Sequence, residues 1–333
     1  MNTEEWNPSK LLGISGSYWA TCALHSGVKL GVFTVIGDQS LTGQKIADKL
    51  SSDDRGVIML LNALSAMGLL IKKNECFLNS DFSKSYLVKE SPQYLGYIIM
   101  HHHHLMASWN ELDKGVKTGK AVRSRASYDN AEVRENFLMG MFNLASNLAP
   151  QIVGKIDLLE KKHLLDLGGG PGTYAIHFCL NNPSLLATIY DQNTTRPFAE
   201  ETVAKFGLSD RIDFQAGDYV NKDISGTYDV AWLSHILHAE GPQDAQKIIQ
   251  KAVSVLKPEG MILIHEFILN NDMNGPMFPA LFSLNMLLGT QNGQSYSEKQ
   301  IMDMLAAAGV EKLRRLPIQT PNDSGVIQGI VKK

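Results

Sequence analysis

The stretch LLDLGGGPGTYAIHF, Leu164 to Phe178, decides the fold of the second half of the chain. An apolar strand, His163 to Leu167, leads into a turn with four glycines, and a helical pattern begins near Thr173. A strand, a glycine turn and a helix in this order bring backbone N–H groups and a helix N-terminus to the carboxyl edge of a parallel sheet. Small molecules bind at this edge, so we expect a ligand site here.

The spacing of the glycines narrows the choice of ligand. The dinucleotide fingerprint G-x-G-x-x-G requires a glycine at position 173, where this chain has Thr173. Instead, Asp166 at the strand end is followed by G-x-G-x-G at Gly168, Gly170 and Gly172. This pattern resembles the S-adenosylmethionine (SAM) turn of class I methyltransferases; a bare glycine-rich turn is the alternative. Glycines let the backbone lie under the methionine part of the ligand, and a carboxylate suits its α-ammonium group or bound water.

Two further acidic residues follow neighbouring strands. Asp191 ends the strand LATIYD, where a carboxylate can accept from both ribose hydroxyls, although the same position would serve NAD. Asp218 and Tyr219 follow the next strand, where a carboxylate can accept from an adenine amino group beside an aromatic wall. A role in a surface loop is the alternative for Asp218. Strands and helices alternate from His163 onward, which predicts a parallel, doubly wound sheet.

The first hundred residues read as a winged helix. Residues 17–36, 43–50 and 55–70 carry apolar side chains at helical spacing, with Thr42 as an N-cap, and two short strands surround Lys73-Asn74. Residues 1–100 hold nine basic and nine acidic side chains, so their charges balance. Arg55 is the only basic residue of the third predicted helix. Such a helix would read DNA poorly, so we expect dimerisation through the apolar faces of the first helices.

Composition bounds the class of protein. A chain of 333 residues has room for about two domains. The net charge of −3 argues against nucleic acid as a partner, and three scattered cysteines indicate neither a disulfide framework nor a Cys-rich metal site. The N-terminal residues lack a signal-peptide pattern, and no apolar run approaches about 18 residues. We therefore expect a cytoplasmic protein without a membrane partner.

Over nearly its whole length the chain resembles the small-molecule O-methyltransferases of the caffeate and acetylserotonin type, together with bacterial polyketide O-methyltransferases. The resemblance implies SAM as cofactor, S-adenosylhomocysteine as product, a small-molecule substrate and a homodimer. It also implies a Rossmann-like class I methyltransferase sheet (α/β) behind an all-α, winged-helix dimerisation domain. We expect this domain over 1–105, linking helices over 106–155 and the SAM-binding domain over 156–333. The matching features are LGVFTVI, WNELDKGVKTGK, DLGGGPG, the strand end at Asp191, Gly217-Asp218, Leu237-His238, LKPEG and MLLGTQNGQSYSEKQIMDMLAAAGV.

By this resemblance His238 occupies the place of the catalytic base, and Glu266 matches an acid that orients it. A phenol or alcohol is a weak nucleophile until its proton leaves, and a neutral imidazole with an ordinary pKa near 6.5 can take that proton. The carboxylate would accept from the other ring nitrogen. His235, one turn earlier, is the competing histidine, for which a structural role is the alternative.

The acceptor should lie between the methyltransferase sheet and the helices of residues 92–150. We expect its pocket to be walled by His104, Met141, Phe142, Phe282 and Met286. For Met141 and Phe142, plain core packing is the alternative. The run His101 to His104 could face solvent, the core edge or the substrate. No carboxylate or cysteine stands one turn away from these histidines, so we expect no metal.

Three positions depart from the pattern of the plant members. Ala239 follows the histidine where they have Asp, Ser295 aligns with a second acid beside the base, and Ser234 aligns with a lysine near the adenine. Among bacterial relatives are enzymes that rely on proximity and some that methylate carbon or nitrogen. C- or N-methylation of a conjugated ring therefore stays an alternative, as does a winged-helix regulator that senses SAM. The sequence does not name the methyl acceptor.

Overall fold

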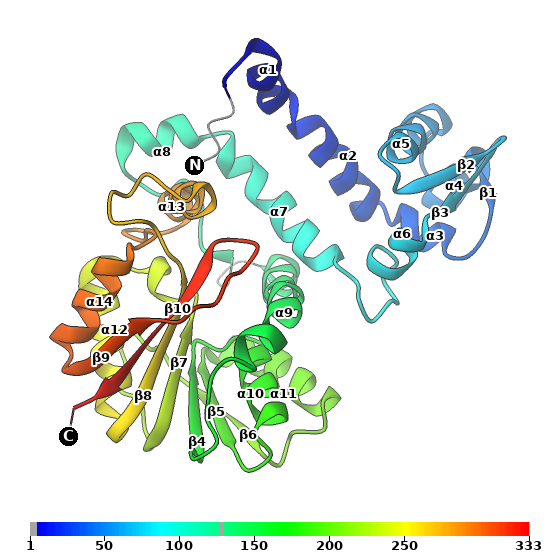
Figure 1. Cartoon of the computed structure of the whole chain (residues 1–333). Coiled ribbons are helices and arrows are strands. Elements are labelled where there is room, and N and C mark those ends of the chain that lie inside the picture. The colour runs from blue at the N-terminus through cyan, green and yellow to red at the C-terminus, as the bar shows by residue number, and fades with distance from the viewer. Residues whose placement is uncertain (1–4, 127–129, 333) are drawn as a thin grey trace. The chain divides into compact units, whose positions relative to one another are not determined.

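The computed structural model describes residues 5–126 and 130–332. The chain divides into two compact units, Met1–Leu105 and Met106–Lys333, here called the N-terminal and C-terminal units (Figure 1). The helix that ends the N-terminal unit continues to Trp109. Each unit has its own hydrophobic core, and each is described by itself below.

The N-terminal unit is a small helical domain with a β-wing. Its core gathers apolar side chains from α2 to α5 and from the three-stranded sheet, whose order is β1-β3-β2. The predicted helix over 17–36 is broken at Gly31, which has φ 73°, because this left-handed residue ends α2 and starts α3 in a new direction. The elements are α1 Pro8–Gly16, α2 Tyr18–Lys29, α3 Val32–Ile36, β1 Leu41–Thr42, α4 Gly43–Leu50, α5 Asp54–Ala66, β2 Leu70–Lys73, β3 Cys76–Asn79, α6 Asp81–Tyr86 and α7 Gly96–Trp109.

Side-chain caps set two of these helix starts. The Thr42 hydroxyl accepts a hydrogen bond from the backbone N–H of Lys45 at 3.3 Å, which confirms Thr42 as the N-cap of α4. One carboxylate oxygen of Asp53 accepts from the N–H of Gly56 at 2.9 Å and begins α5. Such caps satisfy N–H groups that have no partner within the helix.

The C-terminal unit is built on a seven-stranded sheet with the order β6-β5-β4-β7-β8-β10-β9. The five strands from β6 to β8 are parallel, as predicted, but β10 pairs antiparallel with both β8 and β9, so the sheet is mixed. The expectation of an all-parallel sheet was wrong at this edge because no helix connects β9 to β10. The strands are β4 His163–Leu167, β5 Leu186–Asp191, β6 Ile212–Ala216, β7 Tyr228–Ser234, β8 Leu256–Phe267, β9 Val310–Arg315 and β10 Ser324–Val331.

Helices cover both faces of this sheet (Figure 1). Along β4, Leu164 packs in a core with α9, α10 and α11, whereas Leu165 packs in a second core with α12 and α14. This alternation is the two-residue period of a strand that is buried on both faces. The α/β fold class is confirmed, with a seven-stranded sheet in the C-terminal unit and a helical domain in the N-terminal unit. The helices are α8 Leu112–Thr118, α9 Ala131–Val153, α10 Thr173–Asn181, η2 Asn193–Thr195, α11 Arg196–Lys205, η3 Leu237–Ala239, α12 Pro242–Ser254, α13 Met277–Gly289 and α14 Glu298–Ala307.

The order of the strands positions the site. From β4 the chain steps outward to β5 and β6 and then returns to β7 on the other side of β4. Ligands of open α/β sheets bind at such a switch point, outside the carboxyl ends of the strands.

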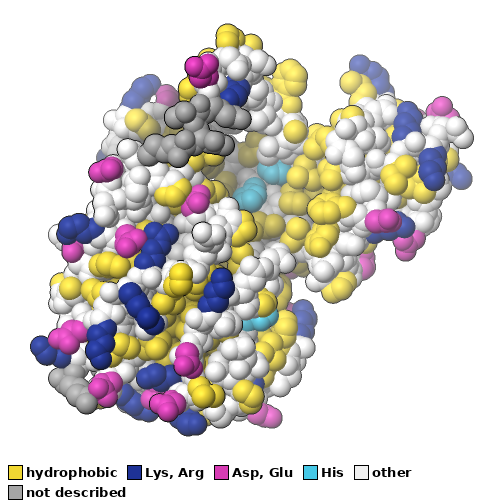
Figure 2. Space-filling view, in the orientation of Figure 1, with side chains coloured by type: hydrophobic (Ala, Val, Ile, Leu, Met, Phe, Trp, Pro, Cys, Tyr) yellow, Lys and Arg dark blue, Asp and Glu magenta, His cyan; other side chains and the backbone are white. Residues whose placement is uncertain are grey.

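The surface carries no block of like charge on the face that Figure 2 shows, where basic and acidic side chains are interspersed. Among the described residues, no helix is both long enough and apolar enough to cross a membrane.

Candidate functional site

The glycine turn after β4 has two kinds of glycine. Gly168 and Gly172 have φ values of 68° and 80°, and a Cβ atom on either would collide with a neighbouring isoleucine side chain. Gly170 also has a positive φ, 55°, but no atom lies within 4 Å of the place where its Cβ would be. The protein itself therefore excludes side chains at Gly168 and Gly172, whereas Gly170 faces open space at the carboxyl edge of the sheet.

Asp191, at the end of β5, holds this turn. One of its carboxylate oxygens accepts from the N–H of Gly170 at 2.8 Å, and the other accepts from the N–H of Gln192 at 2.6 Å. Burial raises the pKa of Asp191, although these hydrogen bonds act against the shift. The structure thus brings together the turn and the residue predicted to face a ribose.

Asp166 lies beneath the turn and is 1% exposed. Its Oδ2 accepts from the N–H of Ala175 at 3.1 Å, whereas Oδ1 is buried without a hydrogen-bond partner in the described part of the chain. Burial raises the pKa of Asp166 to about 7. A buried carboxylate with a free oxygen at a ligand crevice is suited to a cation.

We expect Asp166→Asn to stabilise the ligand-free protein. Because the pKa of Asp166 is about 7 in the folded chain, against an ordinary 3.8 for an aspartate, the folded state favours the protonated acid, and stability falls as pH rises through this window. At about pH 8 the variant should therefore melt a few degrees higher than the parent, and at about pH 4 the difference should vanish. Its affinity for S-adenosylhomocysteine should fall. Thermal melts and calorimetric titrations at the two pH values measure both effects; equal melting temperatures at pH 8 would contradict the shift.

Tyr219 and Asp218, the two residues predicted to face an adenine, follow β6. The ring of Tyr219 lies over Gly168, 3.4 Å from the place where a Cβ of that glycine would be. Asp218 closes a turn by accepting from the N–H groups of Val220 and Asn221 at 2.9 and 3.2 Å. Although burial alone would raise the pKa of Asp218, its hydrogen bonds and Lys251 lower it, so the group is a carboxylate at neutral pH.

Ser234, at the end of β7, belongs to a directed chain of hydrogen bonds. The Ser324 hydroxyl donates to Thr320 Oγ1 at 2.9 Å, so its oxygen is left to accept from Nε2 of His265 at 2.9 Å. Nδ1 of His265 then accepts from the Ser234 hydroxyl, also at 2.9 Å. Burial holds the pKa of His265 well below its usual value, which keeps the ring neutral. Toward a ligand, Ser234 can therefore only accept a hydrogen bond.

His238 and Glu266 form a buried pair beside this crevice. His238 lies in η3, directly after β7, and its Nδ1 is 2.7 Å from Oε2 of Glu266 on β8. The other oxygen, Oε1, accepts from the backbone N–H groups of Leu237 and His238 at 2.9 and 3.3 Å. Burial alone would raise the pKa of Glu266, but His238 and His235 hold it well below its usual range. The carboxylate can only accept, so Nδ1 of His238 carries hydrogen and Nε2 keeps its lone pair.

Aromatic rings surround this pair. The Phe282 ring on α13 meets His238 edge to face with centroids 4.7 Å apart, and Phe267 stacks near His238 at 6.1 Å. Phe267 and Phe282 lie 4.6 Å from each other. Met286, one turn after Phe282, is buried, and its carbonyl accepts from the Thr290 hydroxyl at 2.7 Å. The structure therefore brings His238, Glu266, Phe282 and Met286 into one region.

Two family models match the chain. The O-methyltransferase domain covers residues 109–311, and the O-methyltransferase dimerisation domain covers residues 12–89. The chain belongs to the O-methyltransferase family. It is a small-molecule methyltransferase that uses SAM, and the predicted family is confirmed.

The relatives of this methyltransferase act on several kinds of atom. It is 28% identical over 329 residues to 3-hydroxy-5-methyl-1-naphthoate 3-O-methyltransferase of Streptomyces sahachiroi, covering 97% of this chain and 95% of that one. It is 23% identical over 269 residues, 77% of each protein, to the N,N-dimethyltransferase OxyT of Streptomyces rimosus. Among solved structures, PigF with SAH matches with a TM-score of 0.89 and 25% identity, covering 98% of this chain and 100% of that one. The family thus includes O- and N-methyltransferases.

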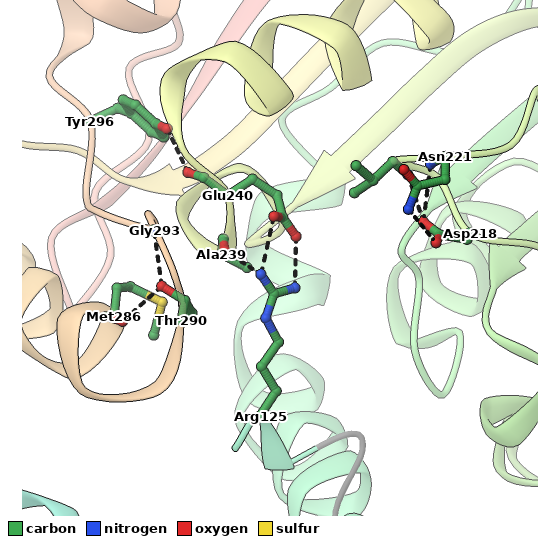
Figure 3. A network of polar contacts seen from close by, with 10 residues as sticks. Arg125, Asp218, Asn221, Ala239, Glu240, Met286, Thr290, Gly293 and Tyr296 are labelled. Carbon is green, nitrogen blue, oxygen red and sulfur yellow. Dashed lines mark hydrogen bonds and ion pairs between the residues drawn. The ribbon is translucent and has the colours of Figure 1, made fainter. Parts of the chain in front are cut away.

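Arg125 reaches the loop of His238 in this methyltransferase (Figure 3). Its guanidinium donates to both carboxylate oxygens of Glu240 at 2.7 and 3.0 Å and to the Ala239 carbonyl at 2.8 Å. From the opposite side, the Tyr296 hydroxyl donates to the Glu240 carbonyl at 2.6 Å. No sequence pattern indicates this clamp, because Arg125 and Glu240 are 115 residues apart and a charged residue in a loop does not indicate its partner.

Loss of the clamp should lower turnover while His238 itself stays in place. We expect Arg125→Ala to reduce kcat by about fivefold to thirtyfold, the equivalent of about 1–2 kcal/mol from a charged hydrogen bond. Arg125→Lys should recover part of it, and Glu240→Gln should add little to Arg125→Ala because both remove one interaction. Steady-state kinetics of the parent, Arg125→Ala, Glu240→Gln and the double variant measure the coupling between the two residues. Arg196→Ala, which removes a surface pair with Glu200, is the matched control. Additive losses would contradict a shared role.

The remaining predicted residues of the methyltransferase lie in other settings. The ring of Phe142 on α9 contacts Phe206 with centroids 6.5 Å apart, and Met141 is half-buried on the same helix. His104 lies on α7 with its ring 5.7 Å from His103 in the N-terminal unit. The wall roles of these three residues stay predictions. Ser295 is fully buried, and its hydroxyl donates to the Pro279 carbonyl at 2.8 Å, so it does not replace a second acid.

Proposed function

We propose that this enzyme transfers the methyl group of SAM to a hydroxyl of a small aromatic molecule, with His238 as general base and Glu266 as its orienting acid. The observation that carries the proposal is the 2.7 Å contact between His238 Nδ1 and Glu266 Oε2. This contact directs the basic Nε2 of His238 away from the carboxylate. It leaves that nitrogen to accept a proton from an acceptor in the crevice.

The chemistry is a direct displacement. The acceptor oxygen attacks the methyl carbon, the carbon–sulfur bond breaks, and the sulfonium leaves as the neutral thioether of S-adenosylhomocysteine. The proton of the hydroxyl passes to Nε2 of His238, which makes the oxygen a better nucleophile and typically contributes about 10²- to 10⁴-fold. The ionised Glu266 stabilises the imidazolium that forms. Holding donor and acceptor together supplies the rest of the rate advantage.

The cofactor would lie along the turn after β4. In this proposal Asp166 serves the α-ammonium group, Gly168 and Gly170 admit the methionine part, and Asp191 accepts from the ribose hydroxyls. The adenine would lie by Asp218, Tyr219 and Ser234. The open space at Gly170 supports this placement, because a side chain there would meet no protein atom within 4 Å.

The acceptor class follows from the surroundings of His238. Phe267 and Phe282 offer flat apolar faces, which favours a planar aromatic substrate over a charged one. Arg125 and Glu240 neutralise each other next to the loop of His238 and so leave no net charge there. Met141, Phe142 and Met286 complete the proposed wall, and a wall role for His104 stays a prediction from the sequence.

A second candidate is N- or C-methylation by proximity. It is favoured by Ala239 and the buried Ser295, which provide no second acid at the base. The similarity to the N,N-dimethyltransferase OxyT points the same way. A SAM-sensing winged-helix regulator is a weaker reading, because basic and acidic side chains balance over the first hundred residues. Location in the cytoplasm stays a prediction.

Two measurements test the function. Calorimetric titration with S-adenosylhomocysteine should show one site per chain, and Gly207→Ala should leave that affinity unchanged. A panel of phenols, naphthols and aromatic amines with methyl-labelled SAM should then show methyl uptake by hydroxyl compounds, with the position assigned by fragmentation of the product. Uptake confined to nitrogen or ring carbon would overturn O-methylation while leaving methyl transfer in place.

We also propose that the enzyme is a homodimer through its N-terminal unit. Large apolar side chains on and before the first two helices are exposed, among them Trp6, Leu12 and Trp19 at 71%, 69% and 71%. An apolar face of this kind is typical of a surface that a partner covers. Gel filtration with light scattering should give twice the chain mass, and Leu12→Lys with Trp19→Lys should shift it toward the monomer. A parent protein that is monomeric at micromolar concentration would contradict the proposal.

A further inference from the structure

His235, His238 and Glu266 converge beyond the catalytic pair. One potential ligand atom from each residue lies within 4.8 Å of the other two. Oε2 of Glu266 is 2.7 Å from Nδ1 of His238 and 3.6 Å from Nδ1 of His235. Two imidazoles and one carboxylate facing a common point form a donor set that suits Zn²⁺ and related divalent ions.

Glu266 is already fixed as a ligand would be. Its Oε1 accepts from two backbone N–H groups, of Leu237 and His238, which hold the carboxylate with Oε2 toward both rings. Hydrogen bonds to the other oxygen of a ligating carboxylate are a regular feature of metal sites. The histidines keep the pKa of Glu266 far below its usual range, so the group is ionised at neutral pH.

His235 approaches the same point in an unusual backbone conformation. Its φ is 56°, a region that costs a residue with a side chain of order 1 kcal/mol or more. Nδ1 of His235 is buried and has no hydrogen-bond partner within the described residues, since the oxygen of Glu266 is just out of range. Burial lowers the pKa of His235, so the ring offers a neutral nitrogen. The fold therefore holds a free ligand atom next to the catalytic pair.

We propose that His235, His238 and Glu266 bind a Zn²⁺ ion that shuts off methyl transfer. Bonds of about 2.0–2.2 Å place two ligands of one ion no more than about 4.4 Å apart. Three ligand atoms that lie within 4.8 Å of one another therefore need only a small adjustment to bind one ion. Zinc takes the place of the hydrogen on Nδ1 of His238, and as that proton leaves to solvent the ring takes up another from solvent at Nε2, so the imidazole stays neutral. The ring then carries its hydrogen on Nε2 and can no longer accept the proton of the acceptor. This inhibitory effect rests on the proposed function, whereas binding of the ion does not.

A competing zinc site has to be separated from this one. In the N-terminal unit the rings of His25 and His103 meet with centroids 5.6 Å apart, near three further histidines of the run 101–104. Nζ of Lys29 lies 3.2 Å from Nε2 of His103, and this cation opposes the approach of a metal ion. His103→Asn is therefore the matched control for His235→Asn, because each variant removes one imidazole from one cluster.

The first experiment measures binding directly. Tag-free protein is titrated with Co²⁺ while its visible d–d absorption is recorded, and then Zn²⁺ is added to displace the cobalt. We expect a band that grows to one equivalent, disappears with zinc, and is lost in His235→Asn but kept in His103→Asn. The apparent affinity should fall at acidic pH, because protons then compete with the metal for the ligand atoms. A band unchanged by His235→Asn would overturn the site.

The second experiment measures inhibition of methyl transfer by zinc. The rate of each variant with zinc is compared with the rate of the same variant without metal. Micromolar Zn²⁺ should inhibit the parent and His103→Asn reversibly, with recovery on chelation, and His235→Asn should need at least about tenfold more zinc, the equivalent of about 1.4 kcal/mol. Mg²⁺, which prefers oxygen ligands, is the negative control. Zinc that binds through His235 without inhibiting would support the site and count against His238 as the base. Equal zinc sensitivity of the parent and His235→Asn would overturn the proposal.

Discussion

His238→Ala should lower kcat by at least about 10²-fold with any hydroxyl acceptor, because the displacement then has to proceed from a neutral phenol or wait for rare deprotonation by water. The contact of His238 with Glu266 at 2.7 Å shows that the imidazole is held in one tautomer, so its removal takes away a preorganised base. KM for SAM should change little, since the hydrogen bonds of the His238 ring and N–H lead to Glu266. Single-turnover kinetics with labelled SAM measure the chemical step itself.

A matched histidine separates base removal from general damage. His177 is half-buried on α10 next to Phe206, on a helix whose core lies on the other face of the sheet from α12. His177→Ala should leave kcat within about twofold of the parent. Equal rates for His238→Ala and the parent would show that methyl transfer needs no base here and would favour the proximity mechanism with a nitrogen or carbon acceptor.

Gly170→Ala should weaken S-adenosylhomocysteine binding by at least about tenfold while the protein stays folded. A methyl group at Gly170 would project into the space assigned to the methionine part of the ligand, where no protein atom lies within 4 Å. The positive φ of 55° adds strain of about 1 kcal/mol in the protein alone. Calorimetric titration gives the change in affinity, and thermal melting gives the strain.

Gly207 supplies the control for this strain. It has φ 67° at the end of α11, and a Cβ there would also meet nothing within 4 Å. Gly207→Ala should lower the melting temperature as much as Gly170→Ala but leave the affinity for S-adenosylhomocysteine at its parent value. Similar affinities for the two variants would place the ligand elsewhere.

The sequence predicted those parts of the fold that depend on local pattern. Glycines that must have positive φ, caps such as Thr42 and strands buried on both faces leave their signature within a few residues. The parallel core and the winged helix followed from such patterns. The antiparallel position of β10 did not follow from such patterns, because its pairing with β8 joins residues as many as 69 positions apart in the chain, as for Ile330 and Met261.

In the candidate site, too, the features that depend on local sequence position were predictable and the long-range contacts were not. Asp166, Asp191 and His238 stand at strand ends, which the sheet brings to one edge, so their sequence positions carry the information. The sequence did not predict contacts between distant parts of the chain, such as the ion pair of Arg125 with Glu240 and the approach of His235 to Glu266. A single sequence shows that these residues are charged or ionisable, but not which way their side chains turn.

The insertion of β10 between β8 and β9 has a consequence for folding during synthesis. Until residues 324–331 have emerged, the strand that carries Glu266 has one unpaired edge, and Ser324 is not yet beside His265. Nascent chains that pause before this point expose a ready template for pairing with another chain. The strand that carries Glu266 thus becomes complete only after β10 has paired with it, and trimming β10 should produce aggregation before it produces a slower enzyme.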